Sequence, residues 1–187
     1  MPRLPELNPS EMTAEQKHVQ DIIASGPRGQ VRGPLAIWLR RPELAVRAQA
    51  LGEYCRYNSS LPKRLSELAI LVTARHWGAE FEWLAHQKHA LDAGLSGDLI
   101  EAIRIGQVPV FADPQEQAVY DIATVLYRDR RLTDGLYASG LTALGEDSLI
   151  DLIGVLGYYA LISMTINAFD VMPPPGTPLA FSDGAGA

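Results

Sequence analysis

Residues 61–94, LPKRLSELAILVTARHWGAEFEWLAHQKHALDAG, decide the fold. Apolar residues recur in the first half of this stretch with the period of an α-helix, and the pattern predicts a helix that ends near Gly78. The positions that show the period are Leu65, Leu68 and Val72. A second helix is predicted from residue 79 or 80 to residue 93, because Gly94 stands where a left-handed residue commonly ends a helix.

The rest of the chain shows the same kind of signal, namely a side-chain cap or a first-turn proline followed by helical spacing. No alternating run bounded by hairpin turns indicates a strand, so the predicted fold class is all-α. The additional helices are expected at about residues 13–24, 35–39, 42–57, 96–105, 113–130, 133–145 and 146–169.

Composition and charge limit the classes of function. The chain of 187 residues has a formal net charge of -6, so it offers no general attraction to nucleic acid or to an anionic membrane surface. The longest apolar stretch, 149–166, is interrupted by polar residues and glycines, which is typical of a buried core helix. The N-terminus has no apolar segment typical of a signal peptide, so a cytoplasmic location is expected.

Histidines and glutamates gather in the two helices of residues 61–94. Glu82 and His86 are four residues apart and share a helix face, and Glu67 lies in an otherwise apolar run where a buried carboxylate needs a partner such as His86. A metal site formed by Glu82, His86 and His89 is a competing interpretation. We expect no metal, because three ligands on one helix normally need a second element to complete the geometry.

Ordinary structural roles compete with functional ones at several positions. A single histidine in a helix is more often a hydrogen-bonded structural residue than a catalyst, an interpretation that competes with a catalytic role for His86 and more strongly for His89 and His76. Trp77 and Trp83 are typical of a core or a subunit interface. Cys55 is the single cysteine, so no disulfide forms within the chain, and its simplest interpretation is a small buried apolar residue.

The segments Leu65–Leu71, Gly78–His86 and Ala90–Leu95 together resemble the carboxymuconolactone decarboxylase family, which includes the alkylhydroperoxidases. In the alkylhydroperoxidase branch the pattern is a glutamate, a Cys-x-x-Cys pair and a histidine four residues after the second cysteine. The resemblance puts Glu67 at the glutamate and His86 at the histidine, with Ala79 and Glu82 at the two cysteine positions.

The substitution of both cysteines argues against thiol peroxidase activity, because neither alanine nor glutamate can attack a peroxide or resolve a sulfenic acid. The resemblance therefore points to a decarboxylase-like branch without the Cys-x-x-Cys pair. It implies a single-domain alkylhydroperoxidase-like helical bundle that forms a homo-oligomer, a trimer or a hexamer, with helices packed across subunits. Its parts are N-terminal helices and a Gly/Pro/Arg loop (1–60), the family core (61–145), a long apolar helix (146–172) and a Pro/Gly-rich tail (173–187) that lies on a partner subunit or is mobile.

The function that the resemblance implies is a lyase acting on a small carboxylated lactone or ring-cleavage product without a cofactor. His86, oriented by Glu67, is the candidate acid and base, and Glu82 could share its proton. A small anionic organic substrate calls for cationic contacts. The candidate substrate contacts are Arg32, Arg56, Arg75, His76 and Trp83. Two alternatives stay open at this point, namely a related hydrolase or isomerase and a non-catalytic oligomeric binding protein.

Overall fold

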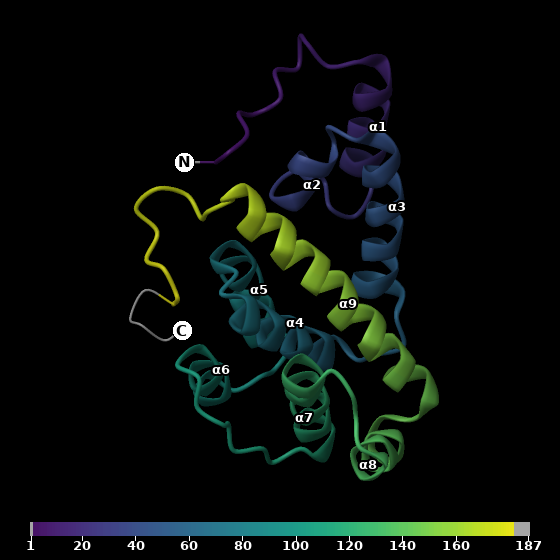
Figure 1. Ribbon diagram of the computed structural model, residues 1–187, viewed down its shortest axis with the longest axis vertical. Helices are drawn as coiled ribbons and strands as arrows, with labels where there is room; N and C mark the ends of the chain where they lie inside the picture. The colour runs from purple at the N-terminus through teal and green to yellow at the C-terminus, as the bar shows by residue number, and fades with distance from the viewer. Residues whose placement is uncertain (1, 182–187) are drawn as a thin grey trace.

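The computed structural model describes residues 2–181, and the described residues form nine α-helices and one π-helical turn, with no strand among them (Figure 1). The all-α prediction is confirmed. In chain order the elements are α1 (Ala14–Ser25), α2 (Pro34–Trp38), α3 (Pro42–Glu53), η1 (Tyr54–Asn58), α4 (Lys63–Trp77), α5 (Glu80–Asp92), α6 (Gly97–Arg104), α7 (Pro114–Asp129), α8 (Asp134–Leu144) and α9 (Glu146–Phe169).

The helix ends follow the local signals of the sequence. Thr13 and Gln16 form a capping box at α1, in which the Thr13 hydroxyl accepts from the Gln16 amide at 3.2 Å and the Gln16 side chain accepts from the Thr13 amide at 2.9 Å. Asp113 and Thr133 cap α7 and α8 in the predicted positions. Gly78 ends α4 with φ of 58°, a conformation that glycine adopts without strain.

One predicted helix is divided in two. The helix expected over 42–57 ends at Glu53, and η1 continues it as a wider π-helical turn. Asp151 of α9 holds this turn from both sides, because one carboxylate oxygen accepts from the Tyr54 hydroxyl at 2.7 Å and the other accepts from the Ser60 amide at 2.6 Å. The turn carries Arg56, so this anchoring decides where that guanidinium lies.

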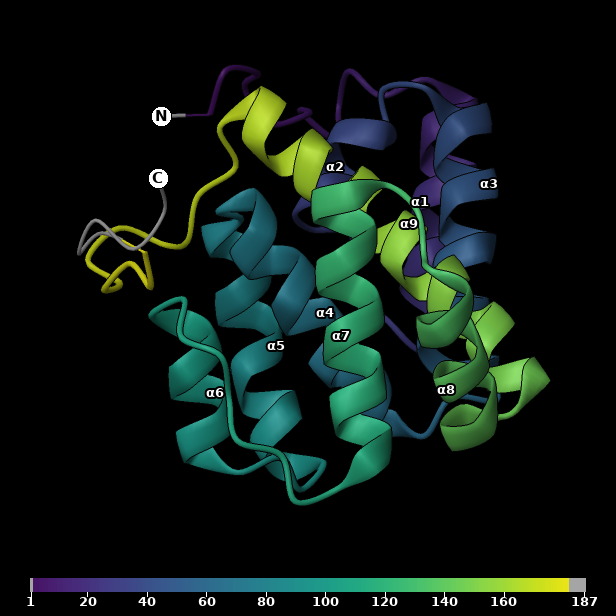
Figure 2. The same cartoon turned by 60° about the horizontal axis from the view of Figure 1, so that its bottom comes forward.

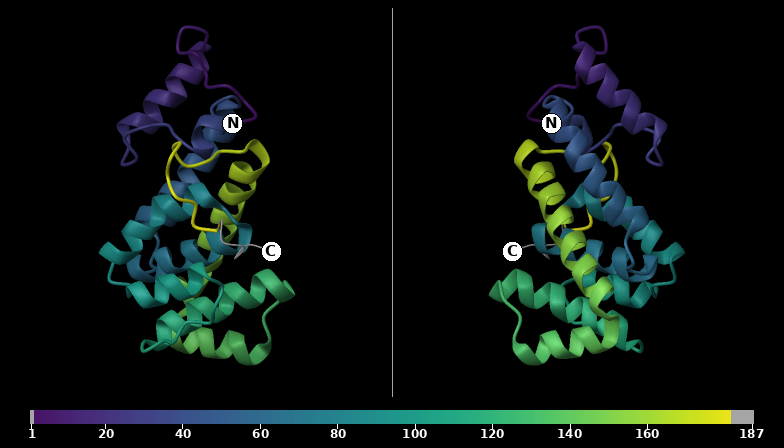
Figure 3. Two further views of the ribbon diagram at one scale, coloured as in Figure 1. Left: turned by 90° about the vertical axis from the view of Figure 1, so that its left-hand side faces the viewer. Right: turned by 90° about the vertical axis from the view of Figure 1, so that its right-hand side faces the viewer.

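Helix α4 occupies the centre of the fold and packs against α5, α7 and α9 (Figure 2). Ten consecutive residues, Leu65–Ala74, are buried, because helices cover α4 on several sides. The molecule extends from α1 at one end to α8 at the other (Figure 3). Burial of the whole middle of α4 also buries its one acidic residue there, Glu67.

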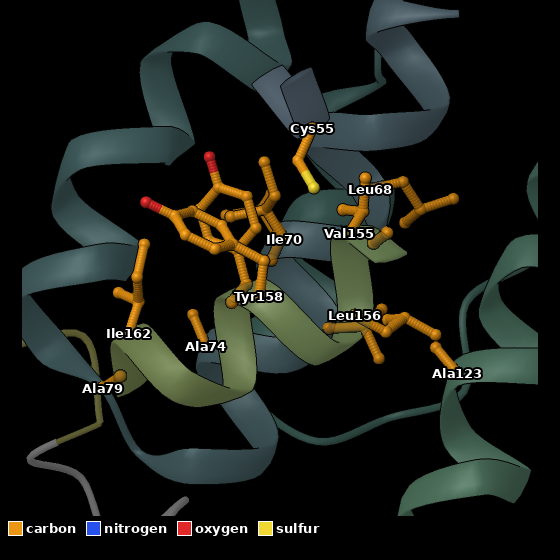
Figure 4. Packing of buried hydrophobic residues seen from close by; sticks show 14 of the residues in the cluster. Cys55, Leu68, Ile70, Ala74, Ala79, Ala123, Val155, Leu156, Tyr158 and Ile162 are labelled. Carbon is orange, nitrogen blue, oxygen red and sulfur yellow. The ribbon is translucent and has the colours of Figure 1, made fainter. Parts of the chain in front are cut away.

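Helix α9 is the predicted apolar core helix. It is long and apolar enough to cross a membrane by length and composition alone, yet 61% of its most apolar window is buried inside the protein. Val155, Leu156 and Ile162 pack into the same hydrophobic cluster as Leu68 of α4 and Cys55 of η1 (Figure 4). The side of α9 that faces away from this cluster is exposed.

The C-terminal segment makes contacts that the sequence did not indicate. The end of this segment docks on its own chain, because the Glu80 carboxylate accepts hydrogen bonds from the amides of Ala180 and Phe181 at 2.6 and 2.9 Å. The Phe181 ring is buried, with its centroid 5.3 Å from that of Trp83. The amino-acid composition of residues 173–181 could not predict this contact, because the groups that hold the segment belong to α5. The rest of the predicted tail, 182–187, lies outside the described residues.

Candidate active site

Glu67, His86 and Glu82 meet in a buried cluster between α4 and α5. Nδ1 of His86 lies 2.7 Å from Oε2 of Glu67, and Nε2 lies 2.9 Å from Oε1 of Glu82. The exposed fractions of Glu67, His86 and Glu82 are 2%, 2% and 4%. Both ring nitrogens therefore face a carboxylate, with little water to screen the interactions.

The local fold explains this convergence. Gly78 reverses the chain after α4 and lets α5 pack beside it. Glu82 and His86 are four residues apart on α5, so their side chains lie on one face, which is turned toward Glu67. A buried carboxylate without a partner is costly, and the imidazole supplies that partner for both glutamates.

The surroundings favour a protonated imidazole. Burial alone lowers the pKa of His86, but the charge of Glu82 and the hydrogen bonds to Glu67 and Glu82 outweigh it, and the pKa of His86 is raised above its ordinary value of 6.5. When both ring nitrogens carry a proton, each can donate to one carboxylate. The cluster is thus a buried relay that holds a proton between two acids.

The relay borders a cavity of about 610 Å³. Glu82 and His86 line it, whereas Glu67 is reached through His86. Tyr159 also lines the cavity, and its ring stands edge-on to the His86 imidazole with the centroids 5.2 Å apart. The other lining residues are Pro27, Arg28, Gln30, Arg32, Pro34, Leu35, Arg56, Tyr57, Ser59, Leu61, Lys63, Ser66, Phe81, Ala85, His89, Tyr158 and Ile162.

Four cationic side chains border this cavity. Arg32 and Arg56 are predicted substrate contacts that the structure brings to it, and Arg28 and Lys63 join them without having been predicted. Within residues 2–181, no ion pair joins any of the four to a carboxylate. In a chain of net charge -6, this concentration of positive charge makes the cavity attractive to an anion.

Three predicted substrate contacts lie outside this cavity. Arg75 and His76 border a different cavity of about 400 Å³, where the His76 ring stacks on Tyr127 at a centroid distance of 4.5 Å. Trp83 is 1% exposed and packs against Phe181. All three are near Glu67 or His86 in sequence, but they project from other faces of α4 and α5.

The positions of Arg28 and Lys63 at the cavity could be predicted from the sequence only in part. Arg28 belongs to the Gly26–Pro34 loop, whose two arginines are visible in the sequence, but nothing there shows that the loop folds back onto α5. Lys63 begins α4 directly after Pro62, in a position that reads as an ordinary exposed lysine. Their convergence is a tertiary effect.

The positions of the missing thiols contain no redox group. Ala79 is fully buried, and Glu82 belongs to the relay. Cys55 is 2% exposed, and burial raises the pKa of its thiol to about 11. A thiol with that pKa is almost entirely protonated at neutral pH, so Cys55 is a poor nucleophile.

The alternative metal site is also tested by the geometry. Among the described residues, no group of three or more His, Cys, Asp or Glu side chains is arranged to hold a metal ion. His89 lines the cavity, but its ring lies 5.8 Å from that of His86, measured between centroids. The two nitrogens of His86 are already occupied by Glu67 and Glu82.

Fold and site together define an all-helical protein with a buried carboxylate–imidazole–carboxylate relay beside a cationic cavity. The model of the carboxymuconolactone decarboxylase family matches residues 42–124, from the start of α3 into α7, and includes all three relay residues. This segment of the chain is similar to that family, and the described residues have an alkylhydroperoxidase-like helical fold. A search of the curated proteins finds no match.

Two solved structures show the same fold at low sequence identity. An uncharacterized peroxidase-related protein from Silicibacter sp. TM1040 is 17% identical, with a TM-score of 0.73 over 93% of this chain and 92% of that one. A protein of unknown function from Agrobacterium tumefaciens, which carries the name antioxidant defence protein AhpD, is 18% identical, with a TM-score of 0.66 over 76% of this chain and 99% of that one. These similarities concern the fold.

Proposed function

We propose that the protein is an acid–base lyase that removes carbon dioxide from a small carboxylated lactone or a related ring-cleavage product. The single observation that carries the proposal is the relay of Glu67, His86 and Glu82 at the border of a cavity that is lined by four cationic side chains. A protein with a purely structural helical core has no need to bury two carboxylates around one imidazole, since burying charges is costly. Access from a cavity to the relay favours catalysis over a non-catalytic binding role.

Proton transfer passes through Glu82 in this proposal. Both nitrogens of His86 are engaged, so the imidazole has no free position for substrate. The His86 proton can move from Nε2 to Oε1 of Glu82 over 2.9 Å, and Glu82 can then donate it to the substrate. Glu67 orients the ring through Nδ1 and stabilises the imidazolium that re-forms.

The reaction follows from these roles. The bond between the ring carbon and the departing carboxylate breaks, carbon dioxide leaves, and its bonding electron pair spreads into a dienolate toward the lactone carbonyl. Arg32 and Arg56 stabilise the negative charge that develops there. The proton from Glu82 then forms a C–H bond, and water restores the proton to the relay. The net change is uptake of one proton and release of carbon dioxide.

A panel of carboxylated lactones and ring-cleavage acids, with carbon dioxide release as the readout, tests the proposal. We expect Glu82→Gln and His86→Gln to reduce the rate by about 10²–10⁴-fold, the usual contribution of general acid–base catalysis. His18→Gln is the matched control, because His18 is exposed on α1 and does not line the cavity. Equal rates in the parent protein and the His86→Gln variant would refute the assignment.

The same panel distinguishes the alternatives. A hydrolase or isomerase would consume lactone without releasing carbon dioxide and would still depend on Glu82 and His86, because both reactions need one positioned base. A binding protein would show saturable binding and no consumption of any member. Peroxide turnover by a thiol mechanism would require a reactive cysteine, and the burial and raised pKa of Cys55 argue against it.

We also propose that the protein forms a homo-oligomer through α9. Exposed residues recur along this helix at positions 150, 153, 157, 161 and 164, the spacing of one helical face. They are apolar or glycine, and Ile150 is 63% exposed. A continuous apolar stripe of this length is typical of a protein contact, and Gly157 lets a second helix approach closely. A second copy of the same stripe is the occupant that we propose.

A further inference from the structure

We propose that Arg28 and Tyr158 form a clamp for a carboxylate of the ligand in the cationic cavity, with Tyr158 positioning the guanidinium. The inference rests on the proposed function only in that this ligand is the anionic substrate. Arg28 lies on the loop between α1 and α2, Tyr158 lies on α9, and both line the cavity. Sequence reasoning selected neither residue for this role.

The first support is the hydrogen-bonding state of the pair. Nη2 of Arg28 donates to the Tyr158 hydroxyl oxygen at 3.3 Å. Nε of Arg28 is buried and has no partner within the described part of the chain. An N–H that is removed from water without an acceptor is unfavourable, so a ligand that supplies an acceptor would be stabilised there.

The second support is the proton of the phenol. Burial raises the pKa of Tyr158 to about 12, so the hydroxyl is protonated at neutral pH. Its oxygen accepts from Arg28, and no acceptor for its own proton is found within residues 2–181. Arg28 and Tyr158 thus line one cavity, and each has a donor group, the Nε–H and the phenolic O–H, that no acceptor among the described residues engages. An acceptor with two oxygens, such as a carboxylate, matches this arrangement.

The third support is the room made for the pair at Gly52. Gly52 is buried in the last turn of α3, which continues directly into η1, so the chain is helical on both sides of a residue type that is less favourable in a helix than alanine. A Cβ atom at this position would lie 2.1 Å from the Tyr158 hydroxyl oxygen and 2.6 Å from Nη2 of Arg28. Any larger residue would displace both groups. The absent side chain of Gly52 therefore allows the phenol and the guanidinium to lie against α3.

The loop that carries Arg28 is held close to α5, the helix that contains Glu82 and His86. Gly33 has φ of 59°, and a Cβ atom there would lie 2.6 Å from the Phe81 ring of α5. Phe81 lines the cavity next to Glu82. Contact with Phe81 thus fixes the end of the loop on the helix that supplies the acid and base. This places a carboxylate bound by Arg28 in the same cavity as the proton donor.

Equilibrium binding of an unreactive probe tests the clamp. The probe is 5-oxotetrahydrofuran-3-carboxylate, a saturated lactone that has no conjugated path for loss of carbon dioxide, and its methyl ester is the uncharged reference. By calorimetry, the parent protein should bind the carboxylate more tightly than the ester. Arg28→Met should weaken carboxylate binding by about tenfold or more, as expected for a charge-assisted hydrogen bond, and leave ester binding unchanged.

Further variants separate positioning from charge. Tyr158→Phe keeps the ring in the core and removes the hydroxyl, so it should lower the ratio of carboxylate to ester affinity by a smaller factor than Arg28→Met. Arg28→Lys keeps the charge but loses the planar fork, and an intermediate ratio is expected. Arg47→Met is the matched control, because Arg47 is exposed and paired with Glu43 on the surface of α3. It should change neither affinity.

The outcomes also separate this inference from the proposed function. Equal carboxylate affinity in the parent and in Arg28→Met would overturn the clamp, and so would a parent protein with no preference for the carboxylate over the ester. If binding depends on Arg28 but no lactone loses carbon dioxide, the clamp stands and the lyase proposal fails. If carbon dioxide is released while Arg28→Met binds the carboxylate normally, the clamp alone is wrong.

Discussion

Replacing Glu67 by alanine should destabilise the protein strongly, because the carboxylate is a buried partner of a buried imidazolium. Glu67 and His86 are both 2% exposed, and their atoms Oε2 and Nδ1 are 2.7 Å apart. Removing one partner of such a pair costs about 3–5 kcal/mol in the free energy of unfolding. His86 keeps Glu82 as its second partner, so the lower end of that range, about 3 kcal/mol, is expected.

The magnitude can be compared with a milder substitution. Glu67→Gln keeps the shape and can still accept a hydrogen bond from Nδ1, so it loses only the difference between a charged and a neutral acceptor, about 1 kcal/mol. For a chain of this size, each kcal/mol lowers Tm by about 2–4 °C. Glu67→Ala should therefore lower Tm by about 6–12 °C, and Glu67→Gln by about 2–4 °C.

Calorimetric or circular dichroism melting at one fixed protein concentration measures both values, since self-association would make Tm depend on concentration. Glu43→Gln is the matched control. Glu43 also forms an ion pair at 2.7 Å, but its side chain is 79% exposed, so Tm should not change. A Glu67→Ala variant that melts with the parent would refute the view that the relay is a coupled, buried pair.

Three other outcomes follow from the structure. The pKa of His86 in the folded state is raised above 6.5, so its protonation stabilises the fold fully at lower pH. The free energy of unfolding of the parent should therefore exceed that of His86→Gln at low pH, and this difference should shrink as the pH rises through the folded-state pKa. Urea titrations at several pH values measure the difference. Cys55 should react with an aromatic disulfide reagent only on unfolding, because its thiol is buried with a pKa of about 11; fast labelling of the native protein would contradict this. Met164→Glu should reduce the mass of the assembly measured by sedimentation. Leu91→Glu, at a similarly exposed leucine on α5, should not reduce it. Equal masses for the parent and Met164→Glu would exclude the α9 contact.

Much of the fold could be predicted because its signals are local. Caps such as Asp113 and the left-handed Gly78 act within a few residues, so the helix boundaries could be read from the sequence. The π-helical turn after Glu53 could not, since it depends on Asp151, which is far away in the chain. The position of Phe181 similarly depends on groups of α5.

The relay was predictable for a physical reason. Glu82 and His86 share a face of one helix, and an acid in the apolar run of α4 requires a partner. The substrate contacts were less predictable, because proximity in sequence does not indicate direction. His76 follows Glu67 by nine residues, which is a rotation of about 180° around the helix axis, so it faces a different cavity.

The most direct test of the relay is a titration of the His86 ring by ¹⁵N nuclear magnetic resonance, with the signals assigned by comparison with His86→Gln. The two carboxylates should hold both ring nitrogens protonated beyond the ordinary range, so the midpoint should lie above 6.5. Glu82→Gln should lower that midpoint, because it removes a charge next to Nε2. A midpoint at or below 6.5 in the parent protein, with a neutral ring at physiological pH, would contradict the account.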